Sequence, residues 1–215
     1  MLGIDEAGRG SVLGPLVVGG FLVGEEDLPR LAGLGAKDSK LLRPRVRREV
    51  YRRLATVGRR FSTAAAPEEI DRAVRHHELN LLEARLFGRL VRRARPGRVV
   101  VDACDPVAAR FGRRVADAAG GIAPVVARHH ADRDEPVVAA ASVVAKVRRD
   151  HAVAVLARRL RRHLGSGYPS DPRTVAVVRE ALAGPDRPAW IRLSWATAER
   201  LKPPARVVPL EGYGP

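Results

Sequence analysis

The chain has 215 residues, enough for one domain with a substantial core and a small addition, but too few for two full domains. Its 39 Lys and Arg against 24 Asp and Glu leave a formal net charge of +15, which indicates an anionic partner such as nucleic acid, unless GC-rich coding alone has raised the arginine content. The single cysteine excludes an intramolecular disulfide, and the longest apolar stretches fall short of the ~18 residues of a membrane span. We therefore expect a globular, cytoplasmic monomer that does not enter a membrane.

The N-terminal part of the chain has the pattern of a β-hairpin. Residues 3–4 are predicted to lie in a strand, residues 8–14 form a glycine-rich turn, and residues 16–23 form a second strand rich in β-branched side chains. Farther along, the spacing of the apolar residues predicts a helix over 43–54, a strand over 61–66 and a helix over 79–93.

The second half alternates between strands and helices. The pattern predicts a strand at 99–101, a helix over 106–119, a strand over 123–127 and a long helix from 136 to about 163. This order indicates an α/β fold with a mixed sheet, whose first strands are antiparallel and whose later strands are joined by helical crossovers. A loop follows, with short helical stretches at 174–182 and 196–201. We divide the chain into a catalytic domain, residues 1–164, and a C-terminal helical appendage and tail, residues 165–215.

Four acidic residues lie where a solvated carboxylate is not expected. Asp5 and Glu6 end the first strand, Asp102 follows the apolar run Val99-Val100-Val101, and Asp132 precedes the start of a helix. Carboxylates gathered at strand ends repel one another unless a cation neutralises them, and oxygen ligands suit Mg²⁺ or Mn²⁺. Two such ions ~4 Å apart can activate water and stabilise the leaving oxygen of a phosphodiester. The four residues are therefore candidates for a metal-dependent nuclease site.

Two features of these residues weigh against a simple site. A single Asp at a strand end is more often a turn former or a helix cap than a metal ligand. Consecutive residues of a regular strand also point to opposite faces, so Asp5 and Glu6 can share one site only at a strand end or a bulge. The histidine pairs 76–77 and 129–130 do not have the spacing of a structural zinc site.

The N-terminal segment resembles the opening signature of ribonuclease HII, the type 2 ribonuclease H. Residues 3–10 read Gly-Ile-Asp-Glu-Ala-Gly-Arg-Gly, followed by Leu13-Gly14-Pro15. Further segments match this family in order: Asp38-Ser39-Lys40, Asp102-Ala103 with Asp105, His129 with Ala131-Asp132, and residues 136–147. Residues 165–174, Gly-Ser-Gly-Tyr-Pro-Ser-Asp-Pro-Arg-Thr, and Ser194-Trp195 resemble its archaeal branch.

The resemblance implies roles for particular residues. Asp5, Glu6, Asp102 and Asp132 match the family's four metal-binding carboxylates, which hold two Mg²⁺ or Mn²⁺ ions. Gly8, Arg9 and Gly10 match its Gly-Arg-Gly motif, whose backbone amides can contact the 2′-OH that distinguishes RNA from DNA. Tyr168 matches the family's second contact at that ribonucleotide, and Lys40 and Lys146 are candidates for phosphate contacts.

The resemblance also implies a fold and an activity. The fold is a ribonuclease H-like mixed sheet flanked by helices, and the enzyme hydrolyses the RNA strand of RNA–DNA hybrids and cuts 5′ of ribonucleotides embedded in duplex DNA, leaving 3′-OH and 5′-phosphate ends. The sequence departs from the family pattern at several positions, namely Ser11, His130, Glu135, Ala139 and Ala196. These departures leave the four carboxylates, the Gly-Arg-Gly motif and Tyr168 intact.

Two other functions stay open at this point. One is a basic protein that binds hybrid duplexes without cutting them, and the other is a ribonuclease H-like nuclease that ignores the 2′-OH. The C-terminus shows no Gln followed by a paired-aromatic ending, the sliding-clamp-binding tail of many archaeal relatives. We therefore expect no strong clamp partner.

Overall fold

A computed structural model describes residues 1–36 and 43–203 of the chain. Within these ranges, one mixed sheet has the strand order β3-β2-β1-β4-β5. The strands are β1 (Leu2–Ala7), β2 (Leu16–Leu22), β3 (Arg59–Ala65), β4 (Val99–Asp102) and β5 (Val125–Arg128). β1 is antiparallel to β2, and β2 to β3, whereas β4 is parallel to β1, and β5 to β4. The expected mixed α/β sheet is confirmed.

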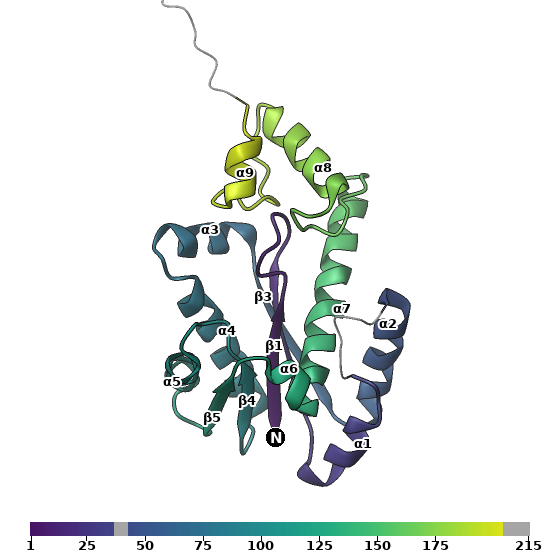
Figure 1. Cartoon of the computed structure of the whole chain (residues 1–215), viewed down its shortest axis with the longest axis vertical. Coiled ribbons are helices and arrows are strands. Elements are labelled where there is room, and N and C mark those ends of the chain that lie inside the picture. The colour runs from purple at the N-terminus through teal and green to yellow at the C-terminus, as the bar shows by residue number, and fades with distance from the viewer. Residues whose placement is uncertain (37–42, 204–215) are drawn as a thin grey trace, which may run out of the picture.

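Helices cover both faces of the sheet, with α4 and α5 on one side and α7 with α1 and α2 on the other (Figure 1). The α-helices are α1 (Leu28–Ala32), α2 (Pro44–Arg53), α3 (Pro67–Arg75), α4 (Leu79–Ala94), α5 (Ala108–Ala119), α6 (Ala131–Asp134), α7 (Pro136–Arg159), α8 (Pro172–Ala183) and α9 (Ala196–Leu201). Short 3₁₀ turns, η1 (Glu25–Asp27) and η2 (Leu54–Thr56), precede α1 and follow α2.

The alternation of side chains along β1 decides what faces each layer. Leu2 and Ile4 are fully buried in the core shared with α4 and α5. Gly3 faces the other way, where an added Cβ would lie 2.2 Å from the carbonyl oxygen of Val137 on α7. Because side chains alternate with a period of two, Asp5 belongs to the α7 face and Glu6 to the α4 face.

Several element boundaries differ from the sequence-based prediction. α3 was not predicted, although Pro67 begins it and the Glu69 carboxylate accepts a hydrogen bond from the Ala66 N–H. α7 ends at Arg159, short of the predicted residue 163, because Arg161 is left-handed (φ 51°) and the Arg162 N–H bonds back to the Ala157 carbonyl.

The C-terminal segment packs on the glycine turn, residues 8–14. The Val12 N–H donates to Gly167, the Gly14 N–H donates to Trp190, and the Val12 carbonyl accepts from Arg192. A hydrophobic cluster joins residues of both regions: Val12, Leu13, Val153, Leu164, Val177, Val178, Ile191 and Ala198. The division at residue 164 stays a prediction, and this cluster lies across it.

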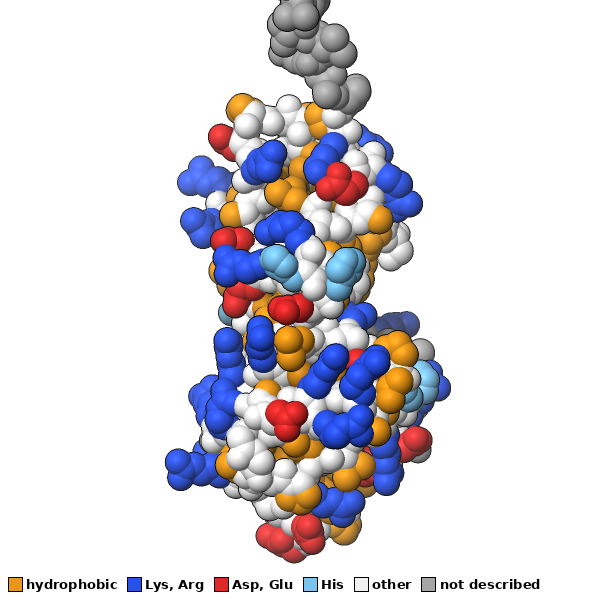
Figure 2. Space-filling model, turned by 90° about the vertical axis from the view of Figure 1, so that its left-hand side faces the viewer, with side chains coloured by type: hydrophobic (Ala, Val, Ile, Leu, Met, Phe, Trp, Pro, Cys, Tyr) orange, Lys and Arg blue, Asp and Glu red, His pale blue; other side chains and the backbone are white. Residues whose placement is uncertain are grey.

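One face of the molecule carries many basic side chains. Figure 2 shows Lys and Arg spread over the face that carries α3, α4 and α5, with isolated acidic side chains among them. This distribution agrees with the formal net charge of +15. Among the described residues, no helix is long and apolar enough to span a bilayer.

Candidate metal and nucleic-acid site

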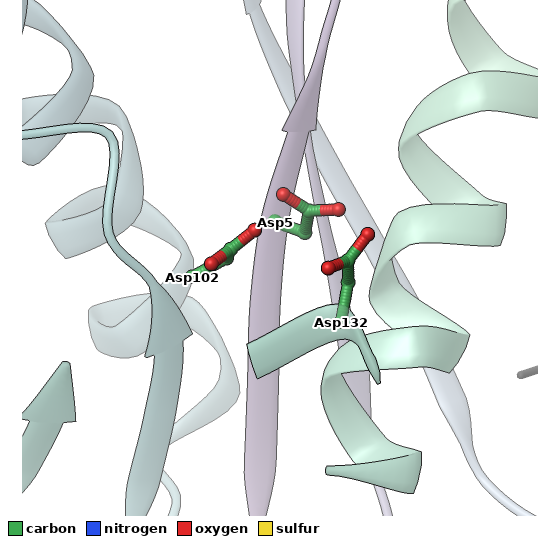
Figure 3. Close-up of side chains that lie close together, drawn as sticks. All are labelled: Asp5, Asp102 and Asp132. Carbon is green, nitrogen blue, oxygen red and sulfur yellow. The ribbon is translucent and has the colours of Figure 1, made fainter. Parts of the chain in front are cut away.

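Three of the four predicted acidic residues converge at one point. Asp5, Asp102 and Asp132 each offer a carboxylate oxygen, and these oxygens lie within 4.8 Å of one another. Figure 3 shows the three side chains directed toward one another from β1, the end of β4 and α6. Asp5 and Asp132 are buried and Asp102 is partly exposed. We call Asp5, Asp102 and Asp132 the carboxylate cluster.

The sheet itself creates the space for this cluster. β1 and β4 are paired in parallel from Leu2 with Val99 as far as Ile4 with Val101, and the pairing stops there. Asp5 and Asp102 are the next residues of each strand, so they follow where the two strands separate. Both belong to the α7 face, since Val100, like Gly3, faces that layer. Asp132 comes from α6, which leads into α7.

Asp102 also forms a hydrogen bond with the first residue of α6. Its Oδ1 accepts a hydrogen bond from the Ala131 N–H at 3.1 Å. The residue before α6, His130, is left-handed (φ 58°), which turns the chain sharply after β5. The same carboxylate that faces Asp132 therefore holds the start of the helix that carries Asp132.

Burial makes the charged form of Asp5 unfavourable. It raises the pKa of Asp5 from 3.8 to about 6, and the neighbouring Asp102 carboxylate adds to that increase. A hydrogen bond from Ser142 on α7 lowers the pKa, and Lys146 lowers it further. The Lys146 ammonium donates to Ser142 Oγ at 2.8 Å, so Ser142 connects Asp5 to the predicted phosphate-binding lysine.

Glu6 lies outside the carboxylate cluster. β1 is regular on its β2 side, with Asp5 opposite Gly19 and Glu6 opposite Val18, and no bulge brings the two acids to one face. The pKa of Glu6 is raised well above its usual value by burial, by Asp5 and by Glu83 of α4. Asp102 also contributes to this increase, so Glu6 lies beside the cluster, on the opposite face of the strand.

The glycine turn is tied to α4 through Arg9. The Arg9 Nε donates to both carboxylate oxygens of Glu83, at 2.9 and 3.1 Å, and its Nη2 donates to Asn80 at 2.7 Å. Glu83 is fully buried and also accepts a hydrogen bond from Cys104 Sγ at 2.7 Å. The Arg9 side chain therefore anchors the turn, while Gly10 at its tip is exposed.

Ser11, which stands where a proline is usual in the resembling family, closes this turn. It is buried, and its hydroxyl hydrogen-bonds the carbonyls of Gly8 and Leu13 at 2.9 and 3.2 Å. These bonds give the turn its own support without a proline.

Tyr168 lies in the loop that follows α7, partly exposed, with the guanidinium of Arg149 4.5 Å from its ring centre. Asp150, four residues after Lys146 on α7, forms an ion pair with Arg47 of α2 at 2.9 Å and a longer one with Arg149 at 3.9 Å. Lys40, the other predicted phosphate contact, lies outside the described residues.

Sequence reasoning missed Glu83, whose position carried a signal. Glu83 falls at helical spacing with Leu79, Leu86, Phe87 and Leu90, so it lies on the apolar face of α4. A carboxylate at such a position needs a partner, and the partner is Arg9.

Comparison with known proteins agrees with these observations. The family model for Ribonuclease HII matches residues 2–198. A Ribonuclease HII from Methanothrix thermoacetophila is 42% identical over 204 residues, covering 94% of this chain and 97% of the relative. The chain is similar to two solved structures, each with a TM-score of 0.84 and each covering 94% of this chain and 96% of the other. They are the ribonuclease H2 from Pyrococcus horikoshii, 38% identical, and the ribonuclease HII from Archaeoglobus fulgidus, 37% identical, which was solved in complex with PCNA.

The matched residues include the whole glycine turn, the carboxylate cluster and Tyr168. The sheet order, the convergence of the three aspartates and the matches over most of the chain lead to one assignment: the chain belongs to the ribonuclease HII family.

Proposed function

We propose that the carboxylate cluster is the catalytic metal site of this endoribonuclease, and that the enzyme cuts 5′ of a ribonucleotide, leaving 3′-OH and 5′-phosphate ends. As a member of the ribonuclease HII family, the chain hydrolyses the RNA strand of RNA–DNA hybrids. The observation that carries the proposal is the approach of Asp5, Asp102 and Asp132 within 4.8 Å at the separation of β1 and β4.

The residues present fit a divalent cation. The cluster offers only carboxylate oxygens, which suit the hard ions Mg²⁺ and Mn²⁺. Burial and mutual repulsion raise the pKa of Asp5, and both effects favour a bound cation. Two such ions would activate water and stabilise the charge on the leaving oxygen. In this proposal the aspartates hold and orient the ions, and Glu6 contributes its carboxylate from the other face of β1.

Substrate recognition is proposed for residues that surround the cluster. Apart from Gly10 and its two chain neighbours, no described residue has an atom within 4 Å of the position a Cβ would take on Gly10, so the turn leaves room for a ribose to approach its backbone. Gly8, Arg9 and Gly10 would then contact the 2′-OH through backbone amides, and Tyr168 would contact the same nucleotide. Lys146, adjacent to the cluster through Ser142, and Lys40 would contact phosphates.

Binding to a sliding clamp is known for one relative and is not part of the function proposed for this chain. The Archaeoglobus fulgidus relative was solved in complex with PCNA. The expected lack of a strong clamp-binding tail in this chain concerns residues 204–215, which lie outside the described residues, and it stays a prediction. The monomeric state also stays a prediction.

The test uses a labelled DNA duplex with one embedded ribonucleotide and an all-DNA duplex of the same sequence. With Mg²⁺ or Mn²⁺ the parent protein should cut only the first duplex, 5′ of the ribonucleotide, and a chelator should stop the reaction. Asp132→Asn should lower the rate by about 100-fold or more, because it removes charge from the cluster. Asp134→Asn, an exposed residue on the same helix, is the matched control and should cut like the parent.

Other outcomes would favour the alternative functions. Binding to the duplex without cutting under both metals would support a non-catalytic binder of hybrids. Cutting of the all-DNA duplex would support a nuclease that does not contact the 2′-OH. If Asp132→Asn and Asp134→Asn lower the cleavage rate equally, the carboxylate cluster is not the catalytic metal site.

A further inference from the structure

Arg149 is a buried cation between the two segments proposed to contact the ribonucleotide. It lies on α7, seven residues after Ser142, and is only 4% exposed. The glycine turn lies on one side of its guanidinium and the loop of residues 165–170, here the tyrosine loop, on the other.

Two glycines make room for this side chain. A Cβ on Gly8 would lie 2.6 Å from Arg149 Nε, and a Cβ on Gly167 would lie 2.6 Å from Arg149 Nη2. Both glycines have positive φ, 88° and 85°. A side chain at either position would therefore collide with the guanidinium, so the arginine and the two glycines fit one another as a set.

Arg149 also makes directed contacts with the tyrosine loop. Its Nη2 donates to the Ser166 carbonyl at 2.8 Å, and its guanidinium stacks over the Tyr168 ring at 4.5 Å. The two segments are joined directly as well, because the Val12 N–H donates to the Gly167 carbonyl at 2.9 Å. Arg149 therefore contacts the tyrosine loop and lies against Gly8 of the glycine turn.

The arrangement is unfavourable for stability alone. Burial lowers the pKa of Arg149, and its Nε is buried without a hydrogen-bond partner among the described residues. A buried charge with an unmatched donor is generally less stabilising than an apolar side chain of similar size. Asp150, 3.9 Å from Arg149 Nη1, is exposed and lies closer to Arg47, at 2.9 Å. A role in positioning accounts for a cation at this place better than packing does.

We propose that Arg149 is a positioning residue that holds Tyr168 and the glycine turn in one fixed geometry, so that both contact the same ribonucleotide. This inference rests on the proposed function of Tyr168 and the turn. A planar guanidinium is needed, because an ammonium can neither stack flat on the ring nor fill the space beside both glycines.

The test is a double-mutant cycle between Arg149 and Tyr168, measured as kcat and KM on the duplex with one ribonucleotide. In the parent background, Arg149→Met should lower kcat about tenfold with a small change in KM, because the loss is in geometry and not in phosphate binding. In a Tyr168→Ala background, the same substitution should lower kcat less than about threefold. Arg148→Met, which removes the same charge from an exposed neighbour on α7, should leave kcat unchanged.

Thermal unfolding of each variant separates folding from positioning. If Arg149→Met does not fold, Arg149→Lys replaces it in the cycle. We expect the same decrease in kcat, although lysine keeps the positive charge. Equal fold-losses with and without the Tyr168 ring would overturn the proposal, as would full activity of Arg149→Lys. A parent protein that binds the duplex but does not cut it would instead reject the proposed function and would be seen before any variant is made.

Discussion

Two buried carboxylates outside the cluster, Asp105 and Glu83, stand in opposite electrostatic situations. The side-chain hydrogen bond from Arg110 is the main cause that lowers the pKa of Asp105 from 3.8 to about 2, with help from the Val107 N–H. Burial is the main cause that raises the pKa of Glu83, and Arg9 only partly offsets it. The fold therefore favours the charged form of Asp105, whereas burial disfavours the charged form of Glu83 and Arg9 offsets part of that effect.

For Asp105 this difference gives a dependence of stability on pH. Because the pKa is lower in the folded state, its contribution is fully present above the unfolded value near 3.8 and is lost as the pH falls toward about 2. We predict that Asp105→Asn is about 1–2 kcal/mol less stable than the parent near neutral pH, and that the gap narrows between about pH 4 and pH 2.5. Urea unfolding of the metal-free proteins measures the gap, with Asp117→Asn on the exposed side of α5 as control. If the difference in free energy of unfolding between the parent and Asp105→Asn does not change with pH, the charge of Asp105 is not its cause.

For Glu83 the prediction concerns the loss of a partner. Glu83→Gln leaves the Arg9 guanidinium without its countercharge, so we expect a loss of about 2 kcal/mol in the free energy of unfolding. Glu180→Gln is the matched control, since Glu180 pairs with Arg162 on an exposed surface and should change stability by less than about 0.5 kcal/mol. If Glu83→Gln and the parent unfold at the same urea concentration, the ion pair between Glu83 and Arg9 does not contribute to the free energy of unfolding.

At the scale of elements, the distance between α7 and the sheet decides where Ser142, Lys146 and Arg149 lie. The helix comes so close that a Cβ on Gly19 of β2 would lie 2.4 Å from the Ala141 carbonyl oxygen and 2.4 Å from the Ala145 backbone nitrogen. Both atoms belong to the helix backbone and cannot rotate away. The small residues of the sheet therefore set the position of the helix that borders the carboxylate cluster.

We predict that Gly19→Ala moves α7 away from the sheet. The expected cost is about 3 kcal/mol in the free energy of unfolding, with a loss of nuclease activity at temperatures where the protein is still folded. Gly97→Ala is the control, because apart from its two chain neighbours no described residue has an atom within 4 Å of its Cβ position, and its φ is not in the left-handed region. Gly97→Ala should keep or slightly raise stability. Circular dichroism with the cleavage assay measures both, and an active, stable Gly19→Ala would show that the helix can shift freely.

The elements that sequence predicted well are those with a strong periodic pattern. The hairpin of β1 and β2 and the helix α4 (Leu79–Ala94), predicted over 79–93, agree with the structure. α3 was missed although its buried Pro67, Ile70 and Ala73 have helical spacing, because that pattern covers only nine residues. A tertiary contact also holds this helix, since the Asp71 carboxylate accepts hydrogen bonds from the backbone N–H groups of Leu193 and Ser194. No local pattern reveals a contact across so many residues.

At the scale of the whole molecule, the candidate site combines segments from the two ends of the chain. The acids themselves could be chosen from sequence, because strand ends and a family resemblance both select them. The period of the strand predicted that Asp5 and Glu6 point to opposite faces, and the regular pairing of β1 with β2 has no bulge at these two residues. The role of Arg149 could not be predicted, because it depends on Gly8 and Gly167 meeting in space.

Because the chain has a formal net charge of +15, we predict that added salt weakens substrate binding but does not weaken the fold. Between about 50 and 200 mM salt, KM for a hybrid duplex should rise at least about tenfold, because Lys and Arg that neutralise phosphates release counterions on binding. The free energy of unfolding should stay level or rise over the same range, because salt screens the repulsion among basic groups spread over the surface in Figure 2. Steady-state kinetics and urea unfolding in matched buffers measure the two quantities. A KM indifferent to salt would mean that the arginine content reflects coding bias and not the substrate, whereas a parallel loss of stability would mean that salt acts on the fold and not on binding.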